Sequence, residues 1–481
     1  MEIGLTLISW FNYFVLAYYF AANGVYLLLL VLASGMVLTH LSRLEYGRYQ
    51  KSIHHSVAPP ASVIMAAHNE EANIVESVRS LLNLEYPGYE VIVVNDGSKD
   101  STLESLIKGF GLSRNNVIYR QTLPTSRVKG FYLNPAFPKL IVVDKEHGGK
   151  ADSLNVGINV SRAPYFCSVD ADSVLEESAI TRLMRPIIEE PELVRATGGI
   201  VRIANGSEVA AGRVAQVKLP TDSLSRFQIV EYIRSFLFGR AGLSQLNSLL
   251  IISGTFSMFH KKTVLAVGGY LRETVAEDME LVVRLHKYLR EQGERYRINF
   301  VPDPICWTEA PKDLRTLRKQ RRRWHVGLAE TLYIYRGMLF NPRYGRIGLF
   351  ALPYQLGVEL LGPVIEVAGY FVVTVSFLAG FVNEGFFALF LLMAVLVGIF
   401  FSIAALFLEE LSYRRYQRSR DVLTLLLYGV IENFGYRQLL AFWRTGAVLS
   451  FLFKKESKWD YVRKTGFNAP QERLDNKAQN P

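Results

Sequence analysis

The clearest fold signal in this chain ends in Tyr165-Phe-Cys-Ser-Val-Asp-Ala-Asp172. Residues 141–143 and 165–169 are short apolar runs with β-branched or aromatic side chains, and residues 150–158 between them have the pattern of a helix. This order predicts a β-α-β unit, in which the two strands lie parallel in one sheet.

The second strand of this unit brings two carboxylates, Asp170 and Asp172, to its carboxyl end. Open α/β sheets bind their ligands at that edge. Because residues two apart on a strand share a face, we expect both acids to point at one cation and the phosphates that it holds. An isolated Asp-x-Asp pair is more often an exposed turn, so the meaning of this pair depends on the motifs around it.

The same alternation of strand and helix begins earlier in the chain. Residues 62–67 and 90–94 have the composition of strands, and apolar residues at helical spacing predict a helix over 71–82. The alternation of strand and helix continues through residue 190 and predicts an α/β fold, with a mostly parallel sheet covered by helices on both faces. Residues 123–138 are basic and aromatic, and we interpret them as a loop.

The composition indicates a soluble domain attached to membrane segments. Of 481 residues, 50% are hydrophobic and 20% are charged, and the mean hydropathy of +0.15 is too high for an ordinary soluble enzyme. Much of the net charge of +10 lies beside apolar segments, which favours the lipid bilayer over nucleic acid as the partner. The two cysteines, Cys167 and Cys306, are too few for a disulfide framework or a CxxC metal site.

Three apolar segments are predicted to cross a membrane, which takes about 20 residues each. Residues 14–38 are expected to form one tilted helix, with a hairpin turning at Asn23-Gly24 as the alternative, and residues 349–382 and 386–408 contain two more. The first segment is followed by the basic residues Arg43, Arg48 and Lys51. The positive-inside rule therefore places the domain that comes next in the cytoplasm.

Residues 422–453 are less regular, because Glu432, Arg437 and Arg444 interrupt the apolar sequence. We interpret this part as a re-entrant or interfacial segment. The predicted organisation is an N-terminal membrane segment at 1–42, a cytoplasmic domain at 43–310, an amphipathic interfacial region at 311–346, membrane or re-entrant segments at 347–453 and a polar cytoplasmic tail at 454–481.

Six motifs in the soluble part occur in an order that is found in one family. They are Ser62-Val-Ile-Met-Ala-Ala-His-Asn-Glu-Glu71, Val93-Val-Asn-Asp-Gly-Ser98, Gly148-Gly-Lys-Ala-Asp-Ser-Leu-Asn155, Asp170-Ala-Asp172, Ala276-Glu-Asp278 and Gln320-Arg-Arg-Arg-Trp324. This set resembles the membrane-embedded, processive family 2 glycosyltransferases, the relatives of cellulose, chitin, hyaluronan and poly-N-acetylglucosamine synthases. The resemblance spans about residues 59–336. It implies a cytoplasmic domain of GT-A type, which is Rossmann-like, in a bacterial or archaeal cell membrane.

The resemblance also implies a site for a UDP-sugar donor and a divalent cation, Mg²⁺ or Mn²⁺. Both ions prefer oxygen ligands, which suits Asp172 as the metal ligand. The residues that the resemblance assigns to the donor are His68, Glu70 and Asp96 around the uridine, together with Lys150, Asp170 and Asp172. Two of them have a purely structural alternative, because the sequence around Asp96 favours a turn and Lys150 is near a helix start. His68 stands where the family usually has Tyr, and Met65 where Pro is usual.

Transfer with inversion needs a base that takes the proton of the incoming hydroxyl group, and one carboxylate is enough for this role. Asp278 precedes an apolar-striped helix predicted over residues 279–289 and is our candidate for that base. The alternative is an ordinary acid at a helix start. Ala276 stands where the family usually has Thr.

Gln320, Arg323 and Trp324 are spaced to share one face of a helix. An indole can stack on a sugar ring and a guanidinium can stabilise a departing diphosphate, and the resemblance assigns the motif to the acceptor and the leaving nucleotide. The same region has seven cations, which are Lys312, Arg315, Arg318, Lys319, Arg321, Arg322 and Arg323. Most of these cations are expected to lie on anionic headgroups, on one side of an amphipathic helix.

We therefore expect an enzyme that extends a β-linked polysaccharide from a UDP-sugar, and the resemblance implies that it exports the polymer through its own membrane segments. One alternative is the transfer of a single sugar to a membrane lipid. Another is a non-catalytic membrane scaffold or transport subunit that binds a nucleotide sugar. Glu359 and Glu366 lie on one face of a predicted span, where a carboxylate facing lipid is costly; they line a polymer conduit or form hydrogen bonds between helices.

Overall fold

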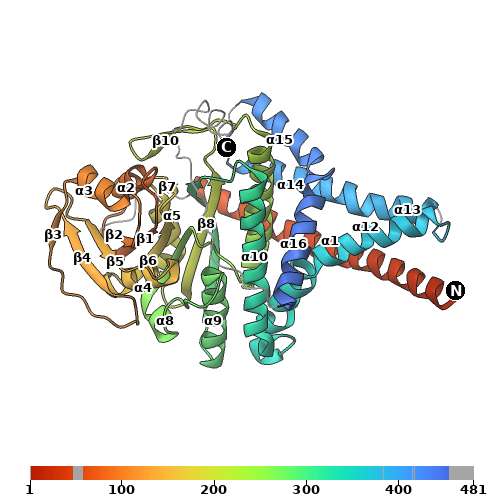
Figure 1. Ribbon diagram of the computed structural model, residues 1–481, viewed down its shortest axis with the longest axis horizontal. Helices are drawn as coiled ribbons and strands as arrows, with labels where there is room; N and C mark the ends of the chain where they lie inside the picture. The colour runs from red at the N-terminus through yellow and green to blue at the C-terminus, as the bar shows by residue number, and fades with distance from the viewer. Residues whose placement is uncertain (1, 47–57, 383, 414, 417, 454–481) are drawn as a thin grey trace.

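The computed structural model describes residues 2–46, 58–382, 384–413, 415–416 and 418–453. Arg48, Lys51 and the predicted tail at 454–481 lie outside this part of the chain. Figure 1 shows a sheet domain at one end of the molecule and a group of long helices at the other, with α9 (Glu277–Glu291) and α10 (Leu314–Ile334) between them.

The centre of the sheet is parallel, as the sequence predicts. The strands β1 (Ala61–Ala67), β2 (Tyr89–Asp96), β5 (Leu140–Lys145) and β6 (Tyr165–Asp170) lie side by side in the order β5-β2-β1-β6. All four run in one direction, so their carboxyl ends meet at one edge. The β-α-β unit of residues 140–172 contributes β5 and β6 to this central group.

The outer strands make the sheet mixed. The ten strands have the order β3-β4-β5-β2-β1-β6-β11-β8-β12-β7, and antiparallel pairs are found at both ends and on each side of β11. These strands are β3 (Ser113–Asn115), β4 (Val128–Leu133), β7 (Ser173–Leu175), β8 (Val194–Ile203), β11 (Phe256–His260) and β12 (Arg297–Thr308). A separate hairpin consists of β9 (Glu208–Ala210) and β10 (Arg213–Gln216). The interpretation of 123–138 as a loop was wrong in part, because β4 pairs with β5 there.

Helices cover both faces of the central strands because side chains alternate along each strand. Ile92 and Val94 of β2 belong to one apolar cluster with Val156 and Val160 of α4 (Lys150–Val160). Their neighbours along β2 belong to the main core with α2 (Ile74–Leu82) and α3 (Thr102–Phe110). The helix predicted over 71–82 starts three residues later than expected.

Three helical segments are long and apolar enough to cross a membrane, Ile8–Ser42, Ile347–Leu378 and Glu384–Ser412. The first belongs to α1 (Glu2–Tyr46), which continues as one helix past Gly24, where the hairpin would have turned. The second ends in α12 (Gly362–Leu378), and the third contains α13 (Glu384–Leu391) and α14 (Val397–Ser412). The predicted fold class, an α/β domain with apolar helices, is confirmed.

A layer of further helices lies between the sheet domain and the apolar segments. It contains α6 (Ser223–Ile233), the π-helical segment η2 (Arg234–Arg240), α7 (Ala241–Gln245) and α10, together with α15 (Ser419–Ile431) and α16 (Tyr436–Leu452). The last two are separated by a break that ends at Gly435, whose φ of 113° favours glycine. Because α16 packs on both α10 and α12, this layer links the sheet to the apolar helices.

Candidate active site

All ten candidate residues line one cavity of about 930 Å³. They come from the carboxyl ends of β1, β2 and β6, from the starts of α4 and α9, and from the middle of α10. They are His68, Glu70, Asp96, Lys150, Asp170, Asp172, Asp278, Gln320, Arg323 and Trp324. Motifs that are far apart in the chain are thus brought together, as the parallel sheet predicts for the strand ends.

Lys150 joins two of the motifs. Its Nζ lies 2.7 Å from Oδ1 of Asp170 and 3.2 Å from Oε1 of Glu277. Burial opposes the charged ammonium, but the carboxylates of Asp170 and Glu277 outweigh it, so the pKa of Lys150 is above its ordinary value. Burial raises the pKa of Glu277 despite the nearby ammonium. Thr255 Oγ1 donates a hydrogen bond of 2.9 Å to the other oxygen of Asp170.

Asp172 lies in a turn and not in the strand. The strand β6 ends at Asp170, and β7 begins at Ser173 on the far edge of the sheet. The expectation that two strand residues present both acids on one face was therefore wrong, although both acids reach the same cavity. The side chain of Asp172 is nearly buried, and its Oδ1 accepts long hydrogen bonds from the hydroxyl groups of Ser173 (3.3 Å) and Thr308 (3.4 Å).

Asp96 anchors the loop that leads to Lys150. Its carboxylate accepts hydrogen bonds from the backbone N–H groups of Gly148 (2.9 Å) and Gly149 (2.8 Å), and it forms an ion pair with the fully buried Lys145. Lys145 also contacts Asp152 at 2.8 Å. Asp96 therefore does more than form a turn, because its side chain fixes the start of α4.

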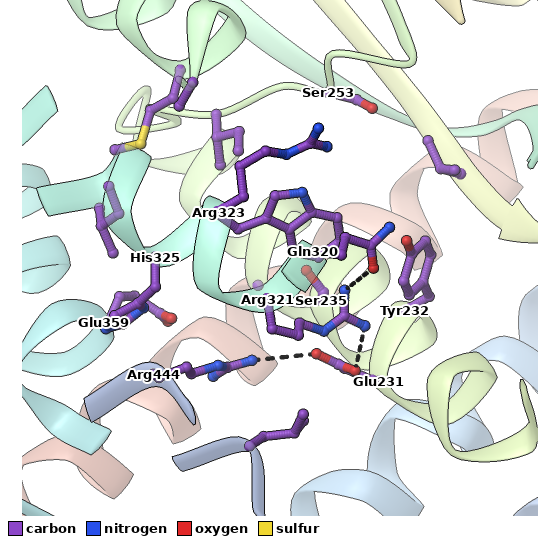
Figure 2. A pocket seen from close by; sticks show the side chains of 18 of the residues that line it. Glu231, Tyr232, Ser235, Ser253, Gln320, Arg321, Arg323, His325, Glu359 and Arg444 are labelled. Carbon is purple, nitrogen blue, oxygen red and sulfur yellow. Dashed lines mark hydrogen bonds and ion pairs between the residues drawn. The ribbon is translucent and has the colours of Figure 1, made fainter. Parts of the chain in front are cut away.

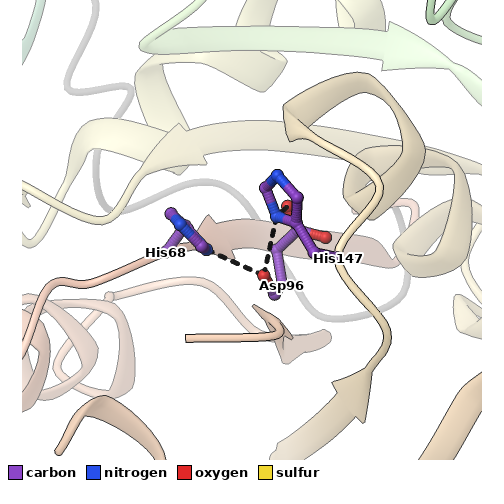
Figure 3. Close-up of side chains that lie close together, drawn as sticks. All are labelled: His68, Asp96 and His147. Atoms are coloured by element: carbon purple, nitrogen blue, oxygen red, sulfur yellow. Dashed lines mark hydrogen bonds and ion pairs between the residues drawn. The ribbon is translucent and has the colours of Figure 1, made fainter. Parts of the chain in front are cut away.

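His68 and His147 flank Asp96 (Figure 3). The Nδ1 of His68 lies 2.8 Å from the backbone oxygen of Asp96, and the Nδ1 of His147 lies 2.9 Å from the carboxylate oxygen Oδ2. The centres of the two rings are 4.6 Å apart. The neighbouring Glu70 lines the same cavity, and its backbone N–H donates to Thr102 Oγ1 at 2.8 Å.

Asp278 lies in the first turn of α9, where the sequence predicts a helix start. Its Oδ1 accepts a hydrogen bond of 2.8 Å from the backbone N–H of Met279. The other oxygen faces the loop at Gly254 so closely that a Cβ at Gly254 would lie 2.9 Å from it and 3.3 Å from Nζ of Lys150. The loop of Gly254 therefore sets the position of both charged groups.

The helix α10 has two different faces in the cavity (Figure 2). Arg321 is 1% exposed, and it binds Glu231 Oε2 at 2.8 Å and Gln320 Oε1 at 2.8 Å. Arg444 reaches the second oxygen of Glu231 at 3.3 Å. Burial would raise the pKa of Glu231, but Arg321 and Arg444 lower it below its ordinary value. Most cations here are expected to lie on headgroups, and Arg321 is an exception because it is a buried ion-pair residue.

Arg323 lies on the side of this helix opposite Arg321, and Trp324 packs against Arg321; both Arg323 and Trp324 line the cavity. Residues two apart on a helix point in nearly opposite directions, and Figure 2 shows Arg323 on the opposite side of the helix from Arg321. Trp324 is 44% exposed and lines the cavity, with the guanidinium of Arg321 stacked 4.3 Å from its ring. This packing holds the indole at the cavity wall.

The cavity continues between the apolar helices. Glu359 and Glu366 line this part of it, with several tyrosines from α1 and from the segment Ile347–Leu378. Tyr354 donates a hydrogen bond of 2.7 Å to Glu359, and Tyr370 donates one of 2.7 Å to Glu366. Both glutamates thus face the cavity and take hydrogen bonds from tyrosines of their own segment, which accounts for two carboxylates within an apolar stretch.

Comparison with known proteins identifies the family. Residues 59–327 match the family described as "Glycosyltransferase like family 2", and the chain belongs to this family. A protein of Staphylococcus epidermidis named "Poly-beta-1,6-N-acetyl-D-glucosamine synthase" is 28% identical over 302 residues, which are 63% of this chain and 62% of the relative. A Staphylococcus aureus protein of the same name is 29% identical over 301 residues, 62% of this chain and 61% of the relative. The chain thus matches about 62% of the length of these curated relatives.

Among solved structures, the chain is similar to the "Mannosyltransferase PcManGT from Pyrobaculum calidifontis in complex with GDP-Man and Mn2+", with 16% identity and a TM-score of 0.49. The match covers 92% of this chain and 100% of that one.

Several residues of the cavity and its surroundings were missed by sequence reasoning. They are Lys145, His147, Glu231, Arg240, Glu277 and Arg444. Glu277 belongs to the motif Ala276-Glu-Asp278 and could have been predicted from it. The others lie outside the six motifs, and a single charged residue gives no signal that separates a buried pair from a solvated surface.

Proposed function

We propose that this chain is a glycosyltransferase that moves a sugar from a UDP-sugar to a hydroxyl group of a growing β-linked polysaccharide, with inversion at the anomeric carbon. The observation that supports this most is a single cavity that holds Asp170, Asp172 and Asp278 and continues between the apolar helices. Membership of the glycosyltransferase family supplies the class of reaction.

In the proposed reaction, Asp278 takes the proton of the acceptor hydroxyl while that oxygen bonds to the anomeric carbon. The bond from this carbon to the phosphate oxygen breaks, and its electron pair leaves with UDP. Arg323 stabilises the charge that develops on the diphosphate, and Trp324 stacks on the acceptor sugar. Lys150 holds Asp170 next to Glu277, so it positions the carboxylate that faces the nucleotide.

A divalent cation, when bound, would neutralise charge on the diphosphate. The carboxylate of Asp172 and the hydroxyl oxygen of Thr308 both line the cavity and lie 3.4 Å apart, and such oxygen ligands fit Mg²⁺ or Mn²⁺. A second group, His68, Asp96 and His147, has ligand atoms within 4.8 Å of one another. We assign the cation to Asp172 because the carboxylate of Asp96 is already bound to Lys145 and two backbone N–H groups.

The acceptor chain would leave through the part of the cavity between the apolar helices, so synthesis would be coupled to export. Tyrosine rings and the hydrogen-bonded carboxylates of Glu359 and Glu366 give this part a polar and aromatic surface, which suits sugar rings better than lipid chains. We expect the sheet domain to lie in the cytoplasm, because basic residues follow the first apolar segment. The relatives' printed product makes UDP-N-acetylglucosamine the first donor to test.

The test is product analysis with the purified full chain in nanodiscs, supplied with radiolabelled UDP-N-acetylglucosamine and Mn²⁺ or Mg²⁺. Labelled chains of increasing length that a β-specific glycosidase degrades would support the proposal. A discrete product that partitions into organic solvent would instead assign the chain to single-sugar transfer onto a lipid. Binding of the donor without turnover, with every UDP-sugar tried, would favour a scaffold.

A further inference from the structure

Arg240 is a partly buried cation in the cavity, and none of the described residues forms an ion pair with it. It ends the π-helical segment η2 and lines the cavity. Its Nε and Nη1 are shielded from solvent and have no hydrogen-bond partner among the residues that the structure describes. Leaving such donors buried and unpaired costs free energy, and a charge costs more than a neutral group.

Two other arginines at the same cavity each form an ion pair with a glutamate. Arg234, six residues earlier on the same segment, donates to Ser402 at 2.7 Å and pairs with Glu432. Arg321 is bound to Glu231 and Gln320. Arg240 therefore differs in its environment and not simply in its residue type, and the difference suggests a partner that comes with the substrate.

The guanidinium of Arg240 has a fixed orientation. It stacks on the ring of Phe236, 3.7 Å from the ring centre, one turn earlier on the same segment. A π-helical turn is frequent at functional sites, and here it brings both residues to the cavity wall. Burial lowers the pKa of Arg240 to about 10, so the side chain remains charged at neutral pH.

Arg240 shares one cavity with the candidate base Asp278 and with Glu359 of the apolar segment. The carboxylates of both residues favour the charged form of its guanidinium. An acceptor that extends from Asp278 toward Glu359 would lie along the same cavity wall. With two carboxylates in its surroundings, Arg240 is a better partner for neutral sugar oxygens than for a further anionic group.

We propose that Arg240 binds the terminal sugar of the acceptor, donating from Nε and Nη1 to its hydroxyl or amide oxygens and so orienting the attacking hydroxyl toward Asp278. This inference rests on the proposed function and extends it to the acceptor site. The planar fork of the guanidinium can hold two oxygens of one sugar ring at once, which a single ammonium cannot do with the same geometry. Arg240 thereby acts on acceptor recognition and not on the donor.

The experiment compares wild type, Arg240→Gln and Arg240→Lys as full chains in nanodiscs, with UDP-N-acetylglucosamine as donor and a β-1,6-linked N-acetylglucosamine oligosaccharide as acceptor. In Arg240→Gln we expect the acceptor KM to rise about tenfold or more, from the loss of charged hydrogen bonds. Donor KM should stay within about twofold of wild type, and the ratio of donor hydrolysis to sugar transfer should rise. The acceptor KM of Arg240→Lys should lie between those of wild type and Arg240→Gln, because lysine keeps the charge but lacks the planar guanidinium.

A thermal melt separates this role from a structural one. Because Arg240 has no carboxylate partner among the described residues, removal of its charge should leave Tm the same or higher in Arg240→Gln. The oligosaccharide should raise the Tm of wild type but not of the variant. Arg290→Gln is the matched control, because Arg290 also stacks on a ring, that of Tyr296, and its Nε is also buried without a partner among the described residues, but it does not line the cavity. It should leave both KM values unchanged.

An acceptor KM within about twofold of wild type in Arg240→Gln, or a loss of activity that follows a fall in Tm, would overturn the inference. Either result can be told apart from a failure of the proposed function, because it requires a wild-type enzyme that transfers sugar. If wild type transfers no sugar from any UDP-sugar, the proposed function fails and this inference fails with it.

Discussion

Replacement of Gly254 by alanine should move the carboxylate of Asp278, the proposed base, without disturbing the fold. The added Cβ would lie 2.9 Å from Oδ2 and 3.2 Å from Cγ of Asp278, and 3.3 Å from Nζ of Lys150. Gly254 is not among the residues with positive φ, so its backbone conformation is open to alanine. The strain therefore falls on the two charged side chains.

The size of the effect follows from these contacts. Ordinary contacts of a Cβ begin near 3.4 Å, so the carboxylate of Asp278 has to retreat by about half an ångström. Because a displacement of about 1 Å can reduce a rate by about a hundredfold, we expect kcat to fall by about tenfold. The donor KM should change little if Asp278 acts on the acceptor hydroxyl and not on the nucleotide.

The assay measures kcat and the donor KM for the full chain in nanodiscs, with a thermal melt of each variant. Gly337→Ala is the control, because a Cβ there would meet no described atom within 4 Å. A Gly254→Ala enzyme with the kcat of wild type and an unchanged Tm would refute the assignment of Asp278 as a base held against this loop. A fall in Tm beside the loss of activity would instead point to a packing defect.

Three further predictions test the pieces around this site. Glu231→Gln should lower the stability by about 3 kcal/mol, because it leaves the buried Arg321 without its carboxylate, and Arg321→Met in the same chain should restore part of the loss. Burial lowers the pKa of His286 to about 4, whereas a histidine in the unfolded state has a pKa near 6.5 and takes up a proton more readily. The free energy of unfolding should therefore fall by about 3 kcal/mol as the pH drops from 6.5 to 4. In His286→Gln this fall should be smaller. Asp172→Asn should abolish the stimulation of turnover by Mn²⁺ or Mg²⁺.

Each of these three has a contrary result. A Glu231→Gln variant as stable as wild type would show that solvent or Arg444 compensates Arg321. A stability curve between pH 4 and 6.5 that is the same with and without His286 would mean that other groups set the pH dependence. If metal ions still stimulate turnover in Asp172→Asn but not in His147→Ala, the cation site would be reassigned to the group of His68, Asp96 and His147.

The sequence was most informative where local pattern and tertiary structure agree. Apolar strands such as 165–169 are buried on both faces in the central sheet, so their composition indicates them directly, and the order of strand ends along the chain then predicts one ligand edge. The convergence of Asp170 and Asp278 on one cavity could be expected from the motifs but not from any local pattern, because they are on separate elements.

The sequence was least informative where long-range pairs decide the outcome. The strand β4 lies in a basic, aromatic stretch that resembles a loop, and it forms because β5 offers an antiparallel partner. Arg321 stands in a run of cations, and its burial depends on Glu231, which is 90 residues away. Arg240 has no local signal at all, since its importance comes from the absence of a partner among the described residues of the fold.

The most direct test of the central claim is a comparison of Asp278→Asn with wild type. If Asp278 is the base of a sugar transfer, the variant should bind UDP with the affinity of wild type and lose turnover of UDP-N-acetylglucosamine by a factor of about a hundred or more. Retention of wild-type turnover with the same products would contradict the proposed mechanism.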